Sequence, residues 1–500
     1  MIERVLKNTG SNILVLIVKV LITFVMTPIF LKNMGNYDYG IWEIIASVVG
    51  YMGILDLGIK PAITRFTAKY EVEKNQSALK VMYSSALIFT IGMGAFLCLL
   101  LVCWGVFYPE TLAPNNTETT KYTLVLMILA IQMLFMFPGY VPESILEGFQ
   151  LYHLKNNITI VNSIVGAIIL YFFISSSNAL YLLALINAVG LSVKYVCYFI
   201  IVTRVKVGGL SPSISNISLS ELKKLLSFGG KSFIQGIAYR IESVTDVLVI
   251  GSFIGPAVVP FYSIPANLIS HIRNVGFTLT QAFMPQFSQL FASNDQEAIR
   301  KLYINASKWI ITIMLPLSIL AVIFGPDFIT LWLGKEYGEE SQLILLLLTI
   351  FTMIPLLDPF KSRYLTAINK HAILAKLFPI AAFINLSVSI LLVNSFGVVG
   401  VAVGSIIPVV IFMPIYLRYS CKQLGITVYR YISEAIIPLI PANLILAFSS
   451  FYTVKFLEIN HYYHLIGYSG LNFVLYLLCV FITLNNQEKT KLKKIIFKNK

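Results

Sequence analysis

The sequence has few charged residues and few cysteines, and both shortages narrow the class of protein. Only 12% of the 500 residues are Asp, Glu, Lys or Arg, whereas 57% are hydrophobic. A soluble domain carries about 25% charged residues, so this composition excludes a soluble globule and predicts a polytopic membrane protein. The five cysteines have neither CxxC nor metal-ligand spacing, so we expect neither a disulfide framework nor a zinc site.

Motifs of soluble enzymes are also missing. The sequence has no HExxH motif, no paired catalytic carboxylates and no Ser, His and Asp set on a common predicted loop. Gly230-Lys231-Ser232 matches the end of a phosphate-binding GxxxxGK[ST] loop, but Leu225 occupies the first glycine position and no predicted strand precedes it. We therefore expect a protein that is not an enzyme, with no ATP site, no metal and no cofactor.

Apolar segments long enough to cross a bilayer recur along the whole chain. A helix needs about 20 apolar residues to span about 30 Å of hydrocarbon. The predicted spans are 12–31, 41–59, 81–107, 122–141, 158–175, 180–203, 228–250, 258–284, 304–325, 342–357, 373–394, 400–417, 432–454 and 463–484. The sequence therefore predicts an all-α membrane protein of about fourteen transmembrane helices.

The distribution of lysine and arginine orients these spans. An even number of spans places both termini on one side of the membrane. If that side is the cytoplasm, the only basic residues of the outer loops are Lys32, Lys121, Lys335 and Lys455. Basic residues concentrate in cytoplasmic loops, so we expect a multi-pass protein of the plasma (inner) membrane with both termini cytoplasmic. The net charge of +14 follows the same rule and indicates no nucleic-acid partner.

The chain is predicted to contain a duplication. A shift of 220 residues places Gly35 on Gly255 and the loop NQSALKVMY (75–83) on DQEAIRKLY (295–303). Six spans per half is an even number, so we expect a parallel repeat of two six-helix bundles. The predicted parts are an N-terminal bundle (1–205), a cytoplasmic linker (206–227), a C-terminal bundle (228–418), two extra helices (432–484) and a basic cytoplasmic tail (485–500).

Four stretches of the sequence resemble a known transporter family. They are YGIWEIIASVVGYMGILDLGIKPAITR (39–65), PESILEGFQLYHLKNN (142–157), DVLVIGSFIGPAVVPFYSIPA (246–266) and NSFGVVGVAVGS (394–405). With the two six-span halves, they resemble the polysaccharide-exporter branch of the multidrug/oligosaccharidyl-lipid/polysaccharide transporter superfamily. The resemblance implies translocation of undecaprenyl-pyrophosphate-linked oligosaccharide units, of O-antigen or capsule type, from the cytoplasmic to the outer leaflet. It also implies a lipid-linked oligosaccharide, membrane lipids and polysaccharide polymerase machinery as partners.

The alternative function within this superfamily is a cation-coupled multidrug exporter, because one fold serves several cargoes. The cavity of such an exporter should be acidic or apolar to suit cationic drugs. The predicted spans instead hold more basic than acidic residues, and the basic ones are Lys19, Lys194, Lys231, Arg240, Arg273, Lys308 and Lys376. This excess favours an anionic cargo, carried by alternating access of the two bundles without ATP hydrolysis.

Four of the basic residues are the predicted pyrophosphate site. A pyrophosphate carries about two negative charges, which cannot enter hydrocarbon without partners. We expect Lys19, Lys231, Arg240 and Arg273 to neutralise it in a central aqueous cavity. Lys194 is equally compatible with a wet face or a structural role.

Lysines near span ends and acids within spans have different predicted roles. Lys308 and Lys376 are expected to reach the membrane interface. Glu242, Asp246 and Asp56 are the predicted site for coupling to H⁺ or Na⁺, because a buried carboxylate readily changes its charge when its environment alternates. The alternative for these acids is structural pairing, for example of Asp56 with Arg65 or of Glu242 with Lys19.

Overall fold

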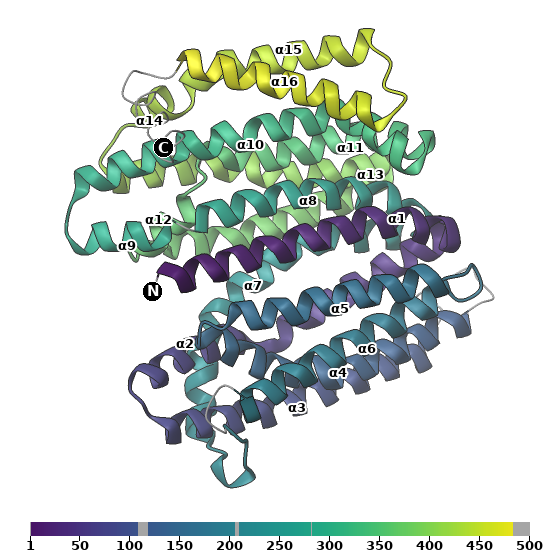
Figure 1. The fold of residues 1–500 in the computed structure, drawn as a ribbon, viewed down its shortest axis with the longest axis vertical. Coiled ribbons are helices and arrows are strands. Elements are labelled where there is room, and N and C mark those ends of the chain that lie inside the picture. Colours follow the sequence, from purple (N-terminus) through teal and green to yellow (C-terminus); the bar gives the residue numbers. More distant parts are fainter. Residues whose placement is uncertain (1, 109–118, 206–209, 282, 484–500) are drawn as a thin grey trace. The chain divides into compact units, whose positions relative to one another are not determined.

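The computed structural model describes residues 2–108, 119–205, 210–281 and 283–483, which form helices joined by turns without any strand (Figure 1). The predicted all-α class is therefore confirmed. The chain divides into two compact units, Met1–Val259 and Pro260–Lys500.

The first unit contains seven α-helices among its described residues. They are α1 (Ile2–Met52), α2 (Ile59–Val72), α3 (Gln76–Phe107), α4 (Thr119–Gly148), α5 (Tyr152–Phe173), α6 (Ala179–Ile200) and α7 (Leu219–Phe253). Helix α4 packs against α3 and α6, and α1 packs against α5 and α7. Short helical turns follow α1, α6 and α7.

The second unit is built from nine further helices of the described chain. They are α8 (Val259–Gln281), α9 (Met284–Ala292), α10 (Gln296–Leu333), α11 (Lys335–Met353), α12 (Lys361–Ala367), α13 (Ala372–Leu424), α14 (Val428–Ala435), α15 (Ile440–Phe456) and α16 (Tyr462–Thr483). Helices α15 and α16 lie side by side and pack against α10 (Figure 1).

The helix lengths agree with fourteen membrane crossings. Ten helical segments of the described chain are long and apolar enough to span a bilayer. Two of them, α1 and α13, each cover two predicted spans, because Gly35 (φ 68°) and Gly397 (φ 58°) break the helix with a backbone conformation that other residues rarely adopt. Helices α7 and α8 are more polar but have 35 and 23 residues, which is long enough to cross.

The predicted duplication appears in the turns of the backbone. Asn75 and Asp295 begin α3 and α10, and each side chain accepts a 2.9 Å hydrogen bond from the backbone N–H three residues further on. The residue before each cap has a positive φ, of 52° and 55°. The turns after α4 and α12 repeat in the same way, since Gln150 and Asn369 have φ of 59° and 57°. Both halves therefore contain the same turns at almost the same interval.

The domain boundaries stay a prediction. The sequence grouped 228–250 with the C-terminal bundle, but α7 packs against α1, α2 and α3 of the first unit. Part of the predicted linker lies outside the described residues, and its end forms the first turns of α7. That end is held to α3, because the N–H of Ser218 donates a 2.9 Å hydrogen bond to Ser85.

A glycine in α4 allows this helix to pack closely against α6. Helix association in lipid depends on such contacts, because lipid tails are as apolar as the side chains. A Cβ atom added at Gly139 of α4 would overlap the ring of Tyr195 of α6. Gly139 therefore allows α6 to approach α4 closely, and this approach brings the polar residues of both helices together.

Candidate functional site

Two glutamates of α4 hold two lysines from neighbouring helices. Lys60 of α2 donates a 2.9 Å hydrogen bond to Glu143. Lys155 of α5 lies 2.6 Å from Glu147 and 3.9 Å from Glu143. The four side chains are only 14–31% exposed, so these ion pairs are shielded far better than pairs on a protein surface.

A third lysine, Lys194 of α6, lies beside these pairs. Its Nζ is 4.5 Å from the ring centroid of Tyr195, and the charges of Glu143 and of Lys19 both act on it. No ion pair joins Lys194 to a carboxylate within the described part of the chain. Lys19 of α1 is exposed and likewise has no ion-pair partner among the described residues. We call Lys19, Lys60, Lys155 and Lys194, with Glu143 and Glu147, the lysine cluster.

The local sequence explains how α4 contributes two acids. Glu143 and Glu147 are four residues apart, so they lie on the same face of the helix. Proline at 138 and 142 occupies the same helix, where it removes backbone hydrogen bonds and favours a kink. Both carboxylates therefore face the lysines of α2 and α5 at the last turns of α4.

Polar side chains fix α1 and α5 to one another next to the cluster. Asn156 follows Lys155 and is only 4% exposed. Its amide donates hydrogen bonds to Ser11 at 2.9 Å and to Asn12 at 2.6 Å, both on α1. The same helix carries Lys19 two turns further on, so Asn156 helps to set the position of Lys19 relative to Lys155.

Aromatic rings form a wall of the lysine cluster. The Nζ of Lys60 lies 4.3 Å from the ring centroid of Tyr140, and that ring meets Tyr195 edge-on at 6.1 Å. Tyr198 continues the wall and donates a 3.0 Å hydrogen bond to the carbonyl of Lys155. Rings beside an ammonium group stabilise its charge without neutralising it. The lysines are therefore held in place yet remain positive.

Lys60 remains protonated despite its burial. Burial favours the neutral amine, but the nearby Glu143, Tyr140 and Glu147 outweigh it and raise the pKa of Lys60 above its ordinary value. With four lysines to two glutamates, the lysine cluster carries an excess of positive charge, and an anion is the ligand that it would attract.

The predicted pyrophosphate residues are not all brought together by the described side chains. Lys19 joins the lysine cluster, whereas Arg273 lies on α8 of the second unit, half-buried, with its guanidinium 6.0 Å from the ring centroid of Phe351. The side chains of Lys231 and Arg240 on α7 lie outside the described residues. Their predicted role in binding pyrophosphate stays a prediction.

The predicted coupling acids occupy different surroundings. Asp246 of α7 is 7% exposed, next to Thr245, whose hydroxyl shares a hydrogen bond with Tyr51 of α1. Asp56 accepts a 2.8 Å hydrogen bond from the N–H of Gly58 and so stabilises the turn between α1 and α2. The side chain of Glu242 lies outside the described residues. A coupling role for these three acids therefore stays a prediction.

Two other expectations about charged residues fare differently. Arg65, the proposed partner of Asp56, has its guanidinium 4.4 Å from the ring centroid of Phe228. Lys376 is exposed, as expected of a lysine that reaches the interface. Lys308 is only 9% exposed, so the prediction that it reaches the interface is wrong. It lies more than three turns inside α10, among neighbours that cover it.

Sequence reasoning missed Lys60, Lys155, Glu143 and Glu147 as site residues. They lie just outside the predicted spans 41–59, 122–141 and 158–175, where charged residues are ordinary. One signal was available, because two glutamates four residues apart closed an apolar span and a lysine followed eight residues later. That spacing predicts a shared helix face but not its ion-pair partners on α2 and α5.

Comparison with known proteins identifies the family. A family model described as "Polysaccharide biosynthesis protein" matches residues 5–291, which is more than half of the chain. The chain belongs to this family. The predicted resemblance to the polysaccharide-exporter branch is thereby confirmed, and residues 5–291 include every member of the lysine cluster.

Individual relatives of this family member are distant in sequence. A "Putative O-antigen transporter" of Shigella flexneri is 23% identical over 413 residues, covering 81% of this chain and 95% of the relative. A "Probable low-salt glycan biosynthesis flippase Agl15" of Haloferax volcanii is 22% identical over 217 residues, covering 43% and 46% of the two chains.

Solved structures share the fold. The lipid II flippase MurJ in an inward closed conformation has a TM-score of 0.71 at 14% identity, covering 99% of this chain and all of its own. An inward-facing multidrug resistance transporter of the MATE family has a TM-score of 0.65 at 14% identity, covering 81% and 95%. At such identities the likeness shows the fold alone, and it confirms a polytopic membrane architecture.

Proposed function

We propose that this polysaccharide biosynthesis family member translocates a lipid-linked oligosaccharide from the cytoplasmic to the outer leaflet of the plasma membrane. The cargo is an undecaprenyl-pyrophosphate-linked repeat unit of O-antigen or capsule type. Relatives named as an O-antigen transporter and as a glycan biosynthesis flippase support this assignment. The protein acts as a transporter rather than an enzyme, by alternating access without ATP hydrolysis, with both termini in the cytoplasm.

The observation that carries the proposal is the excess of lysine over glutamate in the lysine cluster. A pyrophosphate brings about two negative charges, and a compact ammonium group binds phosphate oxygens as a point charge. Lys60 and Lys155 are already paired with Glu143 and Glu147. Lys194 and Lys19 supply the charge that these acids leave unneutralised, and we assign the pyrophosphate to them.

The two glutamates have a role in this scheme. An empty site of four lysines would repel itself and would be costly to keep away from water. Glu143 and Glu147 lower that cost before cargo arrives and leave two lysines for the pyrophosphate. When the cargo departs, the same carboxylates hold Lys60 and Lys155 in place, so the site is ready for the next molecule.

A cation-coupled multidrug exporter is the alternative, and transporters of that class share the fold. Its cargo is cationic, and the lysine cluster would repel it. Coupling of oligosaccharide transport to H⁺ or Na⁺, through Asp246, Glu242 or Asp56, is part of our proposal, as is removal of the product by a polysaccharide polymerase on the outer face. An inside-negative potential also favours outward movement of anionic phosphate, by about 2.3 kcal/mol per charge per 100 mV.

The test is complementation of cells that lack an O-antigen flippase, with surface polysaccharide as the measurement. We expect the parent chain to restore polysaccharide, and Lys19→Ala with Lys194→Ala together to abolish it at equal amounts of inserted protein. Lys194→Arg keeps the charge and should restore a large part. The matched control is Lys301→Ala, which removes a lysine that is 71% exposed and paired with Glu297 outside the cluster.

Two results would contradict the proposal. Full restoration by the double variant would remove the lysine cluster from cargo binding. A parent chain that restores no polysaccharide but protects cells from cationic drugs would favour the multidrug exporter.

A further inference from the structure

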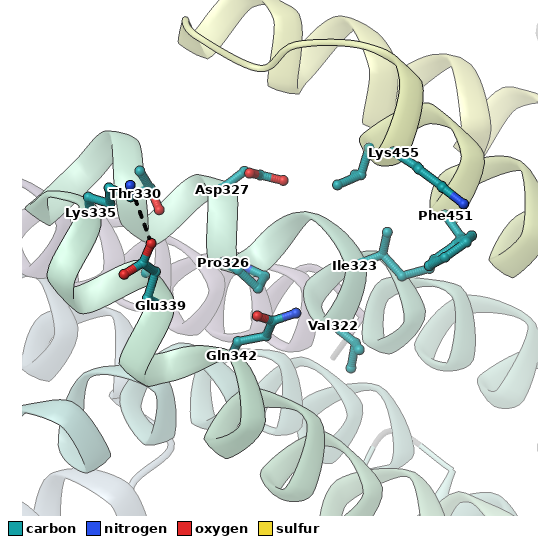
Figure 2. Close-up of a pocket in the computed structure, with 12 residues that line it drawn as sticks. Val322, Ile323, Pro326, Asp327, Thr330, Lys335, Glu339, Gln342, Phe451 and Lys455 are labelled. Carbon is teal, nitrogen blue, oxygen red and sulfur yellow. Dashed lines mark ion pairs between the residues drawn. The ribbon is translucent and has the colours of Figure 1, made fainter.

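The second unit contains a cavity that the proposed transport does not use. It has a volume of about 560 Å³, within the usual range for sites that bind small molecules. It lies between the end of α10, the start of α11 and the end of α15 (Figure 2). Helix α15 belongs to the pair of helices that the sequence predicts to lie outside the repeat.

The lining of the cavity changes from apolar to polar toward the ends of the helices. Val322 and Ile323 of α10 line it first, and Asp327 and Thr330 follow toward the end of the helix at Leu333. At a rise of about 1.5 Å per residue, Asp327 lies about 9 Å from that end and Val322 about 16 Å. The apolar lining on α10 therefore lies further from the helix end than the polar lining. A membrane lipid has the same order, since its acyl chains lie deeper in the membrane than its headgroup.

Helix α15 shows the same order, whereas α11 lines the cavity with polar side chains from Lys335 to Gln342. Lys335 begins α11, and Lys455 stands in the last turn of α15, both at the rim. Phe451 of α15 lies one turn deeper and is exposed at 55%. A ligand with a charged head and an apolar body matches this gradient, whereas a wholly polar solute leaves the deep half of the cavity unsatisfied.

Asp327 lacks a cationic partner within the described chain. One of its carboxylate oxygens is closed off from solvent and accepts no hydrogen bond there. Lys335 is paired with Glu339 at 3.6 Å, and the ammonium of Lys455 lies 5.7 Å from the ring centroid of Phe456. Figure 2 shows the side chain of Lys455 pointing away from Asp327. A carboxylate in this position is stabilised by a cation that comes from outside the protein.

Further acceptors surround the same space. Pro326 has no N–H, so it cannot donate the helix hydrogen bond to the carbonyl of Val322. Gln342 of α11 adds a side-chain amide to the lining. An ammonium group with several N–H donors can use the Asp327 carboxylate and these oxygens together, whereas a quaternary ammonium has no N–H to donate.

We propose that this cavity binds a membrane phospholipid whose headgroup carries a primary ammonium, such as phosphatidylethanolamine. The ammonium faces Asp327, the phosphate lies at the rim near Lys335 and Lys455, and an acyl chain follows Val322, Ile323 and Phe451. The lipid thereby joins α15 to α10 and α11. This inference concerns a resident lipid and does not depend on the identity of the transported cargo.

The experiment is lipid titration of the purified full-length protein in detergent, followed by native mass spectrometry. The probes are phosphatidylethanolamine, phosphatidylcholine and phosphatidylglycerol with identical acyl chains. We expect the first phosphatidylethanolamine to bind at least about tenfold more tightly than either other lipid, because a charge-assisted hydrogen bond to Asp327 is lost with them. Asp327→Asn should remove this preference.

Two further variants keep the test decisive. Ile323→Trp fills the cavity from its apolar side without changing charge and should also remove the preference. Glu458→Gln is the matched control, since Glu458 is an exposed acid after the end of α15 that does not line the cavity. It should bind phosphatidylethanolamine as the parent does.

Three outcomes would overturn the proposal. The first is equal binding of the three lipids by the parent, and the second is an unchanged preference in both Asp327→Asn and Ile323→Trp. The third is displacement of the bound lipid by free phosphoethanolamine at millimolar concentration, which would assign the cavity to a soluble amine instead of a membrane lipid.

Discussion

Lys60 and Glu143 are 83 residues apart in the sequence and form a 2.9 Å hydrogen-bonded ion pair between α2 and α4. The pair connects a short helix outside the predicted spans to one that crosses the membrane. Lys155 and Glu147 add a second connection to α5. The lysine cluster therefore connects three helices and contains two more lysines than glutamates.

The coupling between Lys60 and Glu143 should be measurable. In a double-mutant cycle with Lys60→Met and Glu143→Gln, we expect the free energies of unfolding to be non-additive by about 1 to 3 kcal/mol, because either single change removes the nearest partner of a charge that is largely shielded from solvent. The measurement is thermal or denaturant unfolding in detergent. The exposed pair Lys301 and Glu297 serves as the control and should show no measurable coupling. Additive effects at Lys60 and Glu143 would mean that the pair does not hold α2 to α4.

Gly139→Ala should disturb the lysine cluster through packing alone. The added methyl group would overlap the ring of Tyr195, so α6 must move away from α4, at a cost of about 1 to 3 kcal/mol in unfolding free energy. We also expect reduced transport, since Lys194 lies on α6 and moves with that helix. Gly92→Ala on α3 is the control, because its methyl group meets no atom within 4 Å. Equal stability of the two variants would show that α4 and α6 are not held at this contact.

Much of the fold was predictable, and the reasons are local. Span lengths follow from hydrophobicity, and the turns at 75–83 and 295–303 follow from capping residues that act on the next three residues. The site was predictable only in part. Lys19 is recognisable in the sequence as a basic residue within the predicted span 12–31, but its approach to Lys194 depends on how α1 and α6 pack. Nothing near Lys60 in the sequence indicates Glu143, because only the tertiary fold brings them together.

A buried carboxylate in the second unit gives another prediction. Asp358 and Tyr303 are both fully buried, and the Tyr303 hydroxyl donates a hydrogen bond to the Asp358 carboxylate. Tyr303→Phe keeps the ring but removes the donor, and we expect a loss of about 1 to 3 kcal/mol in unfolding free energy. Tyr364→Phe is the control, because its ring packs 5.1 Å from Tyr303 in the same cluster while no hydrogen bond joins its hydroxyl to the described residues. Similar losses in both variants would assign the effect to removal of a buried hydroxyl in general instead of to the hydrogen bond with Asp358.

Asp246→Asn tests the proposed coupling of transport to an ion. Asp246 is 7% exposed on α7, and the charge of Asp246 acts on Tyr51 of α1. A carboxylate held there can take up and release H⁺ or Na⁺ as its surroundings alternate, whereas an amide of the same shape cannot. We therefore expect Asp246→Asn to slow transport into proteoliposomes and to remove its response to an imposed pH or Na⁺ gradient. Asp38→Asn is the matched control, because Asp38 accepts a 2.9 Å hydrogen bond from Tyr122 in a fixed structural contact. It should keep the gradient response. Transport by Asp246→Asn that is as fast and as gradient-dependent as that of the parent would move the coupling site elsewhere, with Glu242 as the next residue to change.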